Sequence, residues 1–192
     1  MSAKQFAREL RALPKSTKTI DLRINSDGGA VTEARAIYAL LLDETATINV
    51  FVDGIAASAA SFIAMVGDTI TIDEGSFFMI HDARVFTAGT ASDLRAMAAD
   101  LDLMDQMMLD TYAARTGLPA SEIRTMMSAE TWMGGAEAVR LGFADELAAG
   151  KRKAKAIACV ERAGAFKNMP AELRPGRANA LRLLSELKGK LS

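Results

Sequence analysis

The spacing of apolar residues changes repeatedly along the chain and separates predicted helices from predicted strands. Apolar residues three or four positions apart predict helices at residues 2–12, 31–41, 90–115 and 136–141, with a short one after Pro119. Alternating or continuous apolar runs predict strands at residues 20–24, 48–52, 69–73 and 77–81. Helices and strands therefore follow one another up to about residue 147.

The longest predicted helix has the clearest start and stop signals. Thr90 and Asp93 form the pattern of a capping box, and Gly117 and Pro119 follow the last helical turn. At about 25 residues this helix is roughly twice the usual length of about 11–12 residues. Its methionine-rich stripe packs either against the same chain or against another subunit, because methionine adapts to irregular contacts.

Two adjacent glycines, Gly28 and Gly29, stand between the strand 20–24 and the helix 31–41. Glycine allows the backbone a positive φ or a close approach to another group. The amides at the start of the following helix are free to hold an anion or an oxyanion. A plain tight turn explains the same residues equally well, and no Gly-Lys-Ser/Thr follows to make a phosphate loop.

A second turn built from small residues surrounds Ser58. The apolar strand 48–52 ends near Gly54, and the helix that follows the serine closes at Gly67. A serine exposed at a strand-to-helix turn becomes a nucleophile where a histidine reaches it. The alternative is that the run of alanines and serines is only a helix start with a serine cap.

The chain has one histidine, His81, at the end of the apolar run 77–81. Any mechanism that requires an imidazole must therefore use it. The end of a buried strand lies at the edge of the core, where loops gather, and this position favours a chemical role. Carboxylates follow further along the chain, so the sequence offers a serine, a histidine and an acid, as a catalytic triad requires.

Composition narrows the class of protein. The chain has 192 residues, half of them apolar, which suits one globular domain with a real core. The net charge of −1 gives no argument for a nucleic-acid partner, and the single cysteine, Cys159, fits a reducing compartment. The longest near-apolar run, residues 55–66, falls short of the roughly 20 residues of a membrane span. We expect a soluble cytoplasmic protein with no membrane or nucleic-acid partner, no cofactor and no metal.

The composition shifts at Lys151. From there to the C-terminus eleven basic residues face three acidic ones, and Pro170, Pro175 and Gly176 interrupt the segment. Leucines within residues 181–187 are spaced for a terminal helix. We expect a solvated, partly ordered extension, and the alternative is an arm that docks on an acidic partner.

Four short motifs stand in order between residue 6 and about residue 147. They are Ile24–Gly29, Gly54–Ser58, Met79–His81 and Glu137–Asp145. In order and spacing they resemble the signatures of the Clp protease proteolytic subunit family (ClpP-like, peptidase S14). Within it the chain is most similar to the phage and prophage ClpP-like head maturation (prohead) proteases. This likeness rests on the alanine-serine run 56–61, the Glu-Thr-Trp at 130–132 and the charged C-terminal extension.

The resemblance implies an α/β fold of the ClpP and crotonase type, a spiral of ββα units with a long handle helix. It implies a ClpP-like serine protease domain over residues 1–149 and a basic C-terminal extension, partly helical or flexible, over residues 150–192. Family subunits form rings that stack through the handle helix into a closed chamber. We therefore expect a homo-oligomer of ring type.

Position by position, the resemblance makes Ser58 the nucleophile and His81 the general base. It assigns the oxyanion hole to the backbone N–H groups of Gly29 and Ala59. It also places Gly28 beside the bound substrate.

The third triad position falls on Glu130, counted back without gaps from Glu137. The family has an aspartate there, and the extra methylene of glutamate changes its reach to His81. Asp82 is adjacent to His81 and so badly placed for its ring. Asp145 matches a family position that is structural.

The function implied is that of a serine endopeptidase that hydrolyses peptide bonds by a Ser-His-acid mechanism. Its expected substrates are phage capsid or scaffold proteins, in the bacterial host cytoplasm or within the prohead. The first alternative is a Clp proteolytic subunit working with a host AAA+ unfoldase. The chain begins close to its first helix, without the N-terminal strands and axial loop that such subunits use with the ATPase, and this favours the phage role.

Two further alternatives belong to other classes. The family usually has glycine two residues after the nucleophile and proline before the paired glycines, whereas this chain has Ala60 and Asp27. Ala60 and Glu130 keep open a catalytically inactive ClpP-like assembly protein. A crotonase-type acyl-CoA enzyme ranks last, because it does not need Ser58 and His81 together.

Overall fold

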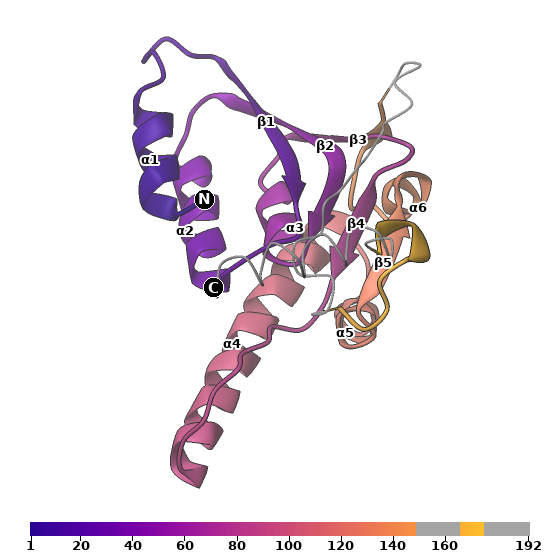
Figure 1. The fold of residues 1–192 in the computed structure, drawn as a ribbon. Coiled ribbons are helices and arrows are strands. Elements are labelled where there is room, and N and C mark those ends of the chain that lie inside the picture. The colour runs from indigo at the N-terminus through magenta and orange to yellow at the C-terminus, as the bar shows by residue number, and fades with distance from the viewer. Residues whose placement is uncertain (149–165, 175–192) are drawn as a thin grey trace, which may run out of the picture.

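A six-stranded sheet organises the chain, with helices packed around it and one long helix projecting away (Figure 1). The computed structural model describes residues 1–148 and 166–174. The strands are β1 (Thr19–Ser26), β2 (Thr47–Ala57), β3 (Thr69–Ile72), β4 (Phe77–Ile80), β5 (Thr131–Gly134) and β6 (Glu146–Leu147). Their order is β5-β4-β2-β3-β6, with β1 beside β2, and only the β4–β5 pair is antiparallel. The mixed α/β architecture confirms the predicted fold class.

The central strand β2 is longer than the apolar run 48–52 predicted. Its first half pairs with β3, and residues 55–57 then pair in parallel with residues 77–79 of β4. A bulge against β1 between Ile24 and Ser26 absorbs the extra residues of β2 around Gly54. The extension matters because it carries the chain to Ser58 alongside the end of β4.

The helices lie where the apolar spacing predicted them. They are α1 (Ala3–Arg11), α2 (Val31–Leu42), α3 (Ala59–Ala64), α4 (Ala91–Thr116), α5 (Ala120–Ser128) and α6 (Gly135–Arg140), followed by a 3₁₀ turn, η2 (Ala171–Leu173). Ser2 caps α1, because its Oγ accepts a hydrogen bond from the amide of Gln5. Helices α2 and α3 contact each other beside the first two strands (Figure 1).

The long helix α4 begins with the predicted capping box. Thr90 Oγ1 accepts a hydrogen bond from the amide of Asp93, and the Asp93 carboxylate accepts one from the amide of Thr90. The helix ends at Gly117, whose φ is 73°. Its buried residues all lie in the second half, and its first half projects beyond the sheet (Figure 1). The methionine-rich stripe is therefore buried to different extents: Met108 joins the core, whereas Leu94, at the start of the stripe, is 45% exposed.

The apolar pattern gave no prediction for β5 or β6. Both are short, two to four residues, and each exists because it pairs with a strand more than fifty residues earlier, β4 or β3. The turn before β6 is held by Asp145, whose carboxylate accepts hydrogen bonds from the amide of Ile70 (2.6 Å) and from Arg115. These contacts fit the structural role expected for Asp145.

The described residues form one main core and a smaller second cluster. Leu41, Val50, Phe62 and Ile70 of the main core are fully buried. The second cluster joins Ile55, Ala57 and Met79 of the sheet to Met169 and Leu173 of the C-terminal extension. Thus residues 166–174 of the extension pack against the body.

Two predictions concern residues outside the described ranges. The predicted domain boundary at residues 149 and 150 lies there, as does the terminal helix expected within residues 181–187. In the described ranges, no helix combines the length and the apolar character needed to cross a membrane.

Candidate active site

Ser58 lies at a sharp turn between β2 and α3. Its backbone has φ 55° and ψ −126°, a conformation that residues with a side chain rarely adopt. The turn is held because the Ser58 amide donates to the carbonyl of Met79 (2.9 Å), while the Ser58 carbonyl accepts from the amides of Ser61 and Phe62. Such a strained turn exposes the serine hydroxyl in front of the sheet.

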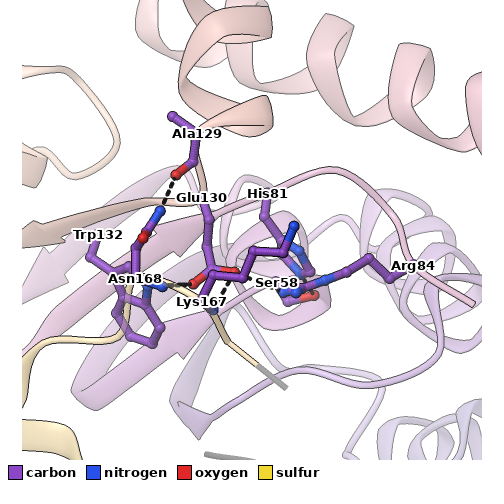
Figure 2. A network of polar contacts seen from close by, with 8 residues as sticks. All are labelled: Ser58, His81, Arg84, Ala129, Glu130, Trp132, Lys167 and Asn168. Atoms are coloured by element: carbon purple, nitrogen blue, oxygen red, sulfur yellow. Dashed lines mark hydrogen bonds and ion pairs between the residues drawn. The ribbon is translucent and has the colours of Figure 1, made fainter. Parts of the chain in front are cut away.

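His81 directly follows β4, and its ring reaches the serine. Its Nε2 lies 2.7 Å from Ser58 Oγ, the distance of a hydrogen bond (Figure 2). The parallel pairing of β2 with β4 brings the two residues together, because both follow the carboxyl ends of adjacent strands. The structure thus joins the predicted nucleophile and the predicted base.

The surroundings of His81 favour its neutral form. Burial lowers its pKa most, the positive charge of Arg84 lowers it further, and the Glu130 carboxylate partly opposes them, so that the pKa falls to about 4. An imidazole with this pKa is unprotonated at neutral pH and is able to accept a proton from Ser58.

Glu130, the predicted third triad member, is 6% exposed and has φ 52°. Its Oε1 accepts from the amide of Asn168 (2.7 Å) and from Trp132 Nε1 (3.3 Å), and its Oε2 accepts from Arg84 (3.0 Å) and from the amide of Lys167 (3.0 Å) (Figure 2). Within the described residues, none of its hydrogen bonds goes to His81. The structure brings its charge near His81 without the predicted contact.

Glu130 is ionised at neutral pH despite its burial. Burial raises its pKa, but the amides of Asn168 and Lys167, Trp132 Nε1 and the Arg84 charge together outweigh burial, so the pKa lies below its ordinary value. The site therefore contains a permanent negative charge close to the imidazole.

Gly28 packs directly against the nucleophile turn, with φ 99°. A Cβ added there would lie 2.7 Å from the Ala57 carbonyl oxygen and 2.8 Å from Ser58 Cβ. The next residue, Gly29, lines the cleft beside Ser58. Ala59 is the first residue of α3, so its N–H has no partner inside the helix.

A cleft of about 560 Å³ opens in front of Ser58 and His81. Its walls are Gly29 and the start of α2, the loop after His81, the inner face of α4 and one residue of the C-terminal extension. Gly28, predicted beside the substrate, packs behind Ser58 and does not line this cleft. The side chains from α4 and the extension are Met97, Leu101, Met104, Met108 and Phe166. The cleft is therefore mostly apolar on the side that faces Ser58 and His81.

The sequence patterns did not predict five residues around Glu130 and His81 as parts of the site: Arg84, Trp132, Phe166, Lys167 and Asn168. Trp132 stood out as the chain's single tryptophan, but nothing tied it to Glu130. Lys167 and Asn168 act through their backbone amides, which every residue except proline has, so the sequence gives no signal for them. Across residues 1–148 and 166–174, no group of three or more His, Cys, Asp or Glu side chains is placed to hold a metal ion.

We expect acylation of Ser58 by a small serine-reactive probe to lose rate only in acid. His81 acts as a base when unprotonated, so the rate constant should be level from about pH 5.5 to 8 and fall through about pH 4. The measurement is the pH dependence of labelling under probe-limited conditions, with circular dichroism to confirm folding at each pH. A half-maximum near the ordinary histidine pKa of 6.5 would contradict the expectation.

Comparison with known proteins gives the family. The family model for Clp protease matches residues 1–151. The chain belongs to the Clp protease family. It is 33% identical over 137 residues to an ATP-dependent Clp protease proteolytic subunit of Pleurastrum terricola. The aligned region covers 70% of each of the two chains. It is 28% identical over 145 residues to proteolytic subunit 1 of Mycobacterium tuberculosis, over 72% of this chain and 70% of that one.

Membership of the Clp protease family confirms the predicted family and enzyme class: the chain is a serine endopeptidase of the Clp type. The comparisons do not confirm the predicted phage head maturation branch. The relatives that they match are called ATP-dependent Clp protease proteolytic subunits.

Proposed function

We propose that Ser58 hydrolyses peptide bonds with His81 as general base and acid. The observation that carries the proposal is the 2.7 Å contact between Ser58 Oγ and His81 Nε2, at a strained turn that opens onto the cleft. The serine alone would be a weak nucleophile, and the imidazole supplies the base that it needs.

The reaction follows from these positions. Ser58 Oγ attacks the substrate carbonyl carbon while its proton passes to His81 Nε2. The C–N bond then breaks, and the same proton goes to the leaving amine. A water molecule, deprotonated by His81, hydrolyses the acyl-enzyme and restores Ser58.

Two further groups lower the barrier in this scheme. The amides of Gly29 and Ala59 stabilise the oxyanion of the tetrahedral intermediate, with Gly28 shaping the turn beside them. The ionised Glu130 favours the imidazolium that forms on His81, since its charge already raises the pKa of that ring. In this arrangement the negative charge of Glu130 acts on His81 electrostatically, without a direct hydrogen bond.

We propose assembly into rings that associate through α4. The first half of α4 projects from the body (Figure 1) and carries exposed Leu94 and Leu103, and the loop before it carries fully exposed Phe86. Large exposed apolar side chains on a projecting element are typical of a protein interface. No cofactor takes part in the proposed reaction.

For substrates, we propose phage capsid or scaffold proteins, cleaved in the bacterial cytoplasm or inside the prohead. The support is the likeness of the alanine-serine run 56–61, Trp132 and the charged extension to the head maturation branch. The second candidate is degradation with a Clp ATPase, which the names of the relatives support.

An ATP-dependence assay separates these two candidates. The assembled protein is incubated with an unstructured protein and with a folded, degradation-tagged protein, each with and without a Clp ATPase and ATP. Capsid maturation predicts limited cleavage of the unstructured protein without ATP and no gain from the ATPase. Processive loss of the folded protein only with ATPase and ATP would favour the second candidate. An intact unstructured protein alongside an ordered oligomer would favour an inactive assembly protein.

A further inference from the structure

Residues 166–174 of the C-terminal extension reach the Ser58–His81 pair through Phe166, which contacts the His81 ring. The Phe166 ring meets the His81 ring edge-on at 5.9 Å and the Trp132 ring at 5.5 Å. The Arg84 guanidinium stands over the same Phe166 ring at 5.6 Å. Phe166 also lines the cleft together with Ser58, so this segment forms part of the substrate site.

The segment uses two of its amides to hold Glu130. The amides of Lys167 and Asn168 donate to different oxygens of the carboxylate, at 3.0 and 2.7 Å. Arg84 and Trp132 take the other positions, one on each oxygen. A carboxylate accepts about four hydrogen bonds, so Glu130 has no lone pair left for the ring of His81.

A separate set of contacts anchors the segment. Met169 and Leu173 are 3% and 6% exposed, and they pack on Ile55, Ala57 and Met79 in the second cluster. The Asn168 side chain donates to the Ala129 carbonyl at 2.7 Å, directly before Glu130. This anchor is apart from the main core, so releasing the segment leaves the sheet and its helices packed.

We propose that residues 166–174 are an autoinhibitory latch, which occupies the carboxylate of Glu130 and one wall of the cleft until the segment is released. The inference rests on the proposed catalytic role of Ser58 and His81. Release removes two of the four donors on Glu130 and frees an oxygen to accept a hydrogen bond from His81 Nδ1. It also removes Phe166 from the cleft, so a substrate chain gains the space.

The charges around His81 determine whether release of the segment raises or lowers its pKa. The groups that act on it are Arg84, from the loop after β4, and Glu130, from the turn between α5 and β5, while Ser58 and Phe166 bring no charge. Loss of Phe166 exposes the ring to water, and a bond from Glu130 stabilises the imidazolium. Both changes raise the pKa of His81 and make it a stronger base.

The test uses the fact that the chain has one histidine. In assembled protein labelled with ¹³C-histidine, the Cε1 resonance titrates His81 alone and requires no assignment. The released variant is Met169→Asp with Leu173→Asp, and the matched control is Glu172→Ala, an exposed residue of the same segment. Asn168→Pro is a second variant, in case the double variant does not fold. It removes one donor to Glu130 and the side-chain bond to Ala129, but it keeps Met169 and Leu173 in the second cluster.

We expect the pKa of His81 to rise by at least one unit in the released variant and to stay unchanged in the Glu172→Ala control. Labelling of Ser58 by a fluorophosphonate at pH 7 should rise at least fivefold with it. In a Glu130→Gln background the release should give a smaller pKa rise and little gain in labelling, because the freed oxygen is no longer an anion.

Each other outcome counts against a defined part of the scheme. An unchanged His81 titration in a released variant that still labels Ser58 would overturn the latch, and so would a fall in labelling, which would make the segment a necessary part of the site. An equal gain in the Glu130→Gln background would also overturn it. Absence of labelling in every variant would overturn the proposed function, and the histidine titration would still decide the latch.

Discussion

Replacing Ser58 with alanine should abolish fluorophosphonate labelling and lower peptide hydrolysis by at least about 10³-fold, the scale on which catalytic nucleophiles act. The physical reason is that Ser58 Oγ is the group hydrogen-bonded to His81 Nε2, and an alanine leaves the imidazole nothing to deprotonate. Removal of the hydroxyl from this surface turn should leave the fold intact. The measurements are mass spectrometry of the labelled chain and steady-state hydrolysis of a peptide ester.

Ser61→Ala is the matched control, three residues further along the same alanine-serine run. Ser61 is fully buried, and its Oγ lies 2.8 Å from the Tyr112 hydroxyl and donates to the Ser58 carbonyl at 2.6 Å. We expect labelling to remain on Ser58, with the free energy of unfolding lowered by about 1–3 kcal/mol because the buried Tyr112 hydroxyl loses its partner. Equal loss of labelling in the two variants would show that the run is structural and that Ser58 is not the nucleophile.

Gly28→Ala should reduce hydrolysis by about 10²-fold, because a small displacement of reacting groups is that costly. The glycine has φ 99°, and a methyl group there would meet the Ala57 carbonyl and Ser58 Cβ at less than 3 Å. Neither neighbour is a flexible side-chain end, so the backbone that carries Ser58 must shift. The readout is kcat/KM for a peptide ester, together with the labelling rate.

Gly117→Ala is the matched control for Gly28→Ala, because it introduces the same kind of backbone strain without a close contact to other atoms. Gly117 also has a positive φ, 73°, but no heavy atom lies within 4 Å of an added Cβ. It caps α4 far from Ser58 in the sequence, and we expect a loss of about 1 kcal/mol in stability with unchanged hydrolysis. If Gly28→Ala behaved in the same way, the tight packing of the glycine turn against Ser58 would not matter for the reaction.

The positions of the helices could be predicted from local patterns. Thr90 and Asp93 cap α4 through contacts three residues apart, and an apolar stripe determines which face of a helix is buried. The turn at Ser58 was also readable, because small residues after an apolar run are needed where strand and helix meet so closely. These features depend on near neighbours, so they are written in the local sequence.

The contact between His81 and Ser58 could be predicted only in part. The end of a strand predicted that His81 lies at the edge of the core, but only the pairing of β2 with β4 places it 2.7 Å from the serine. The short strand β5 was missed for the same reason, since its four residues become a strand through pairing with β4. Strand pairing joins distant segments and leaves little local signal.

By itself, then, the sequence determined the helices, the serine turn, the family and the order of the residues proposed as catalytic. The tertiary structure alone decided what Glu130 bonds to: its donors include Arg84, Lys167 and Asn168, which lie 46, 37 and 38 residues away along the chain. A carboxylate turns toward the strongest set of donors within reach. Which donors are within reach depends on how distant segments pack, and two of these are backbone amides that any residue type supplies.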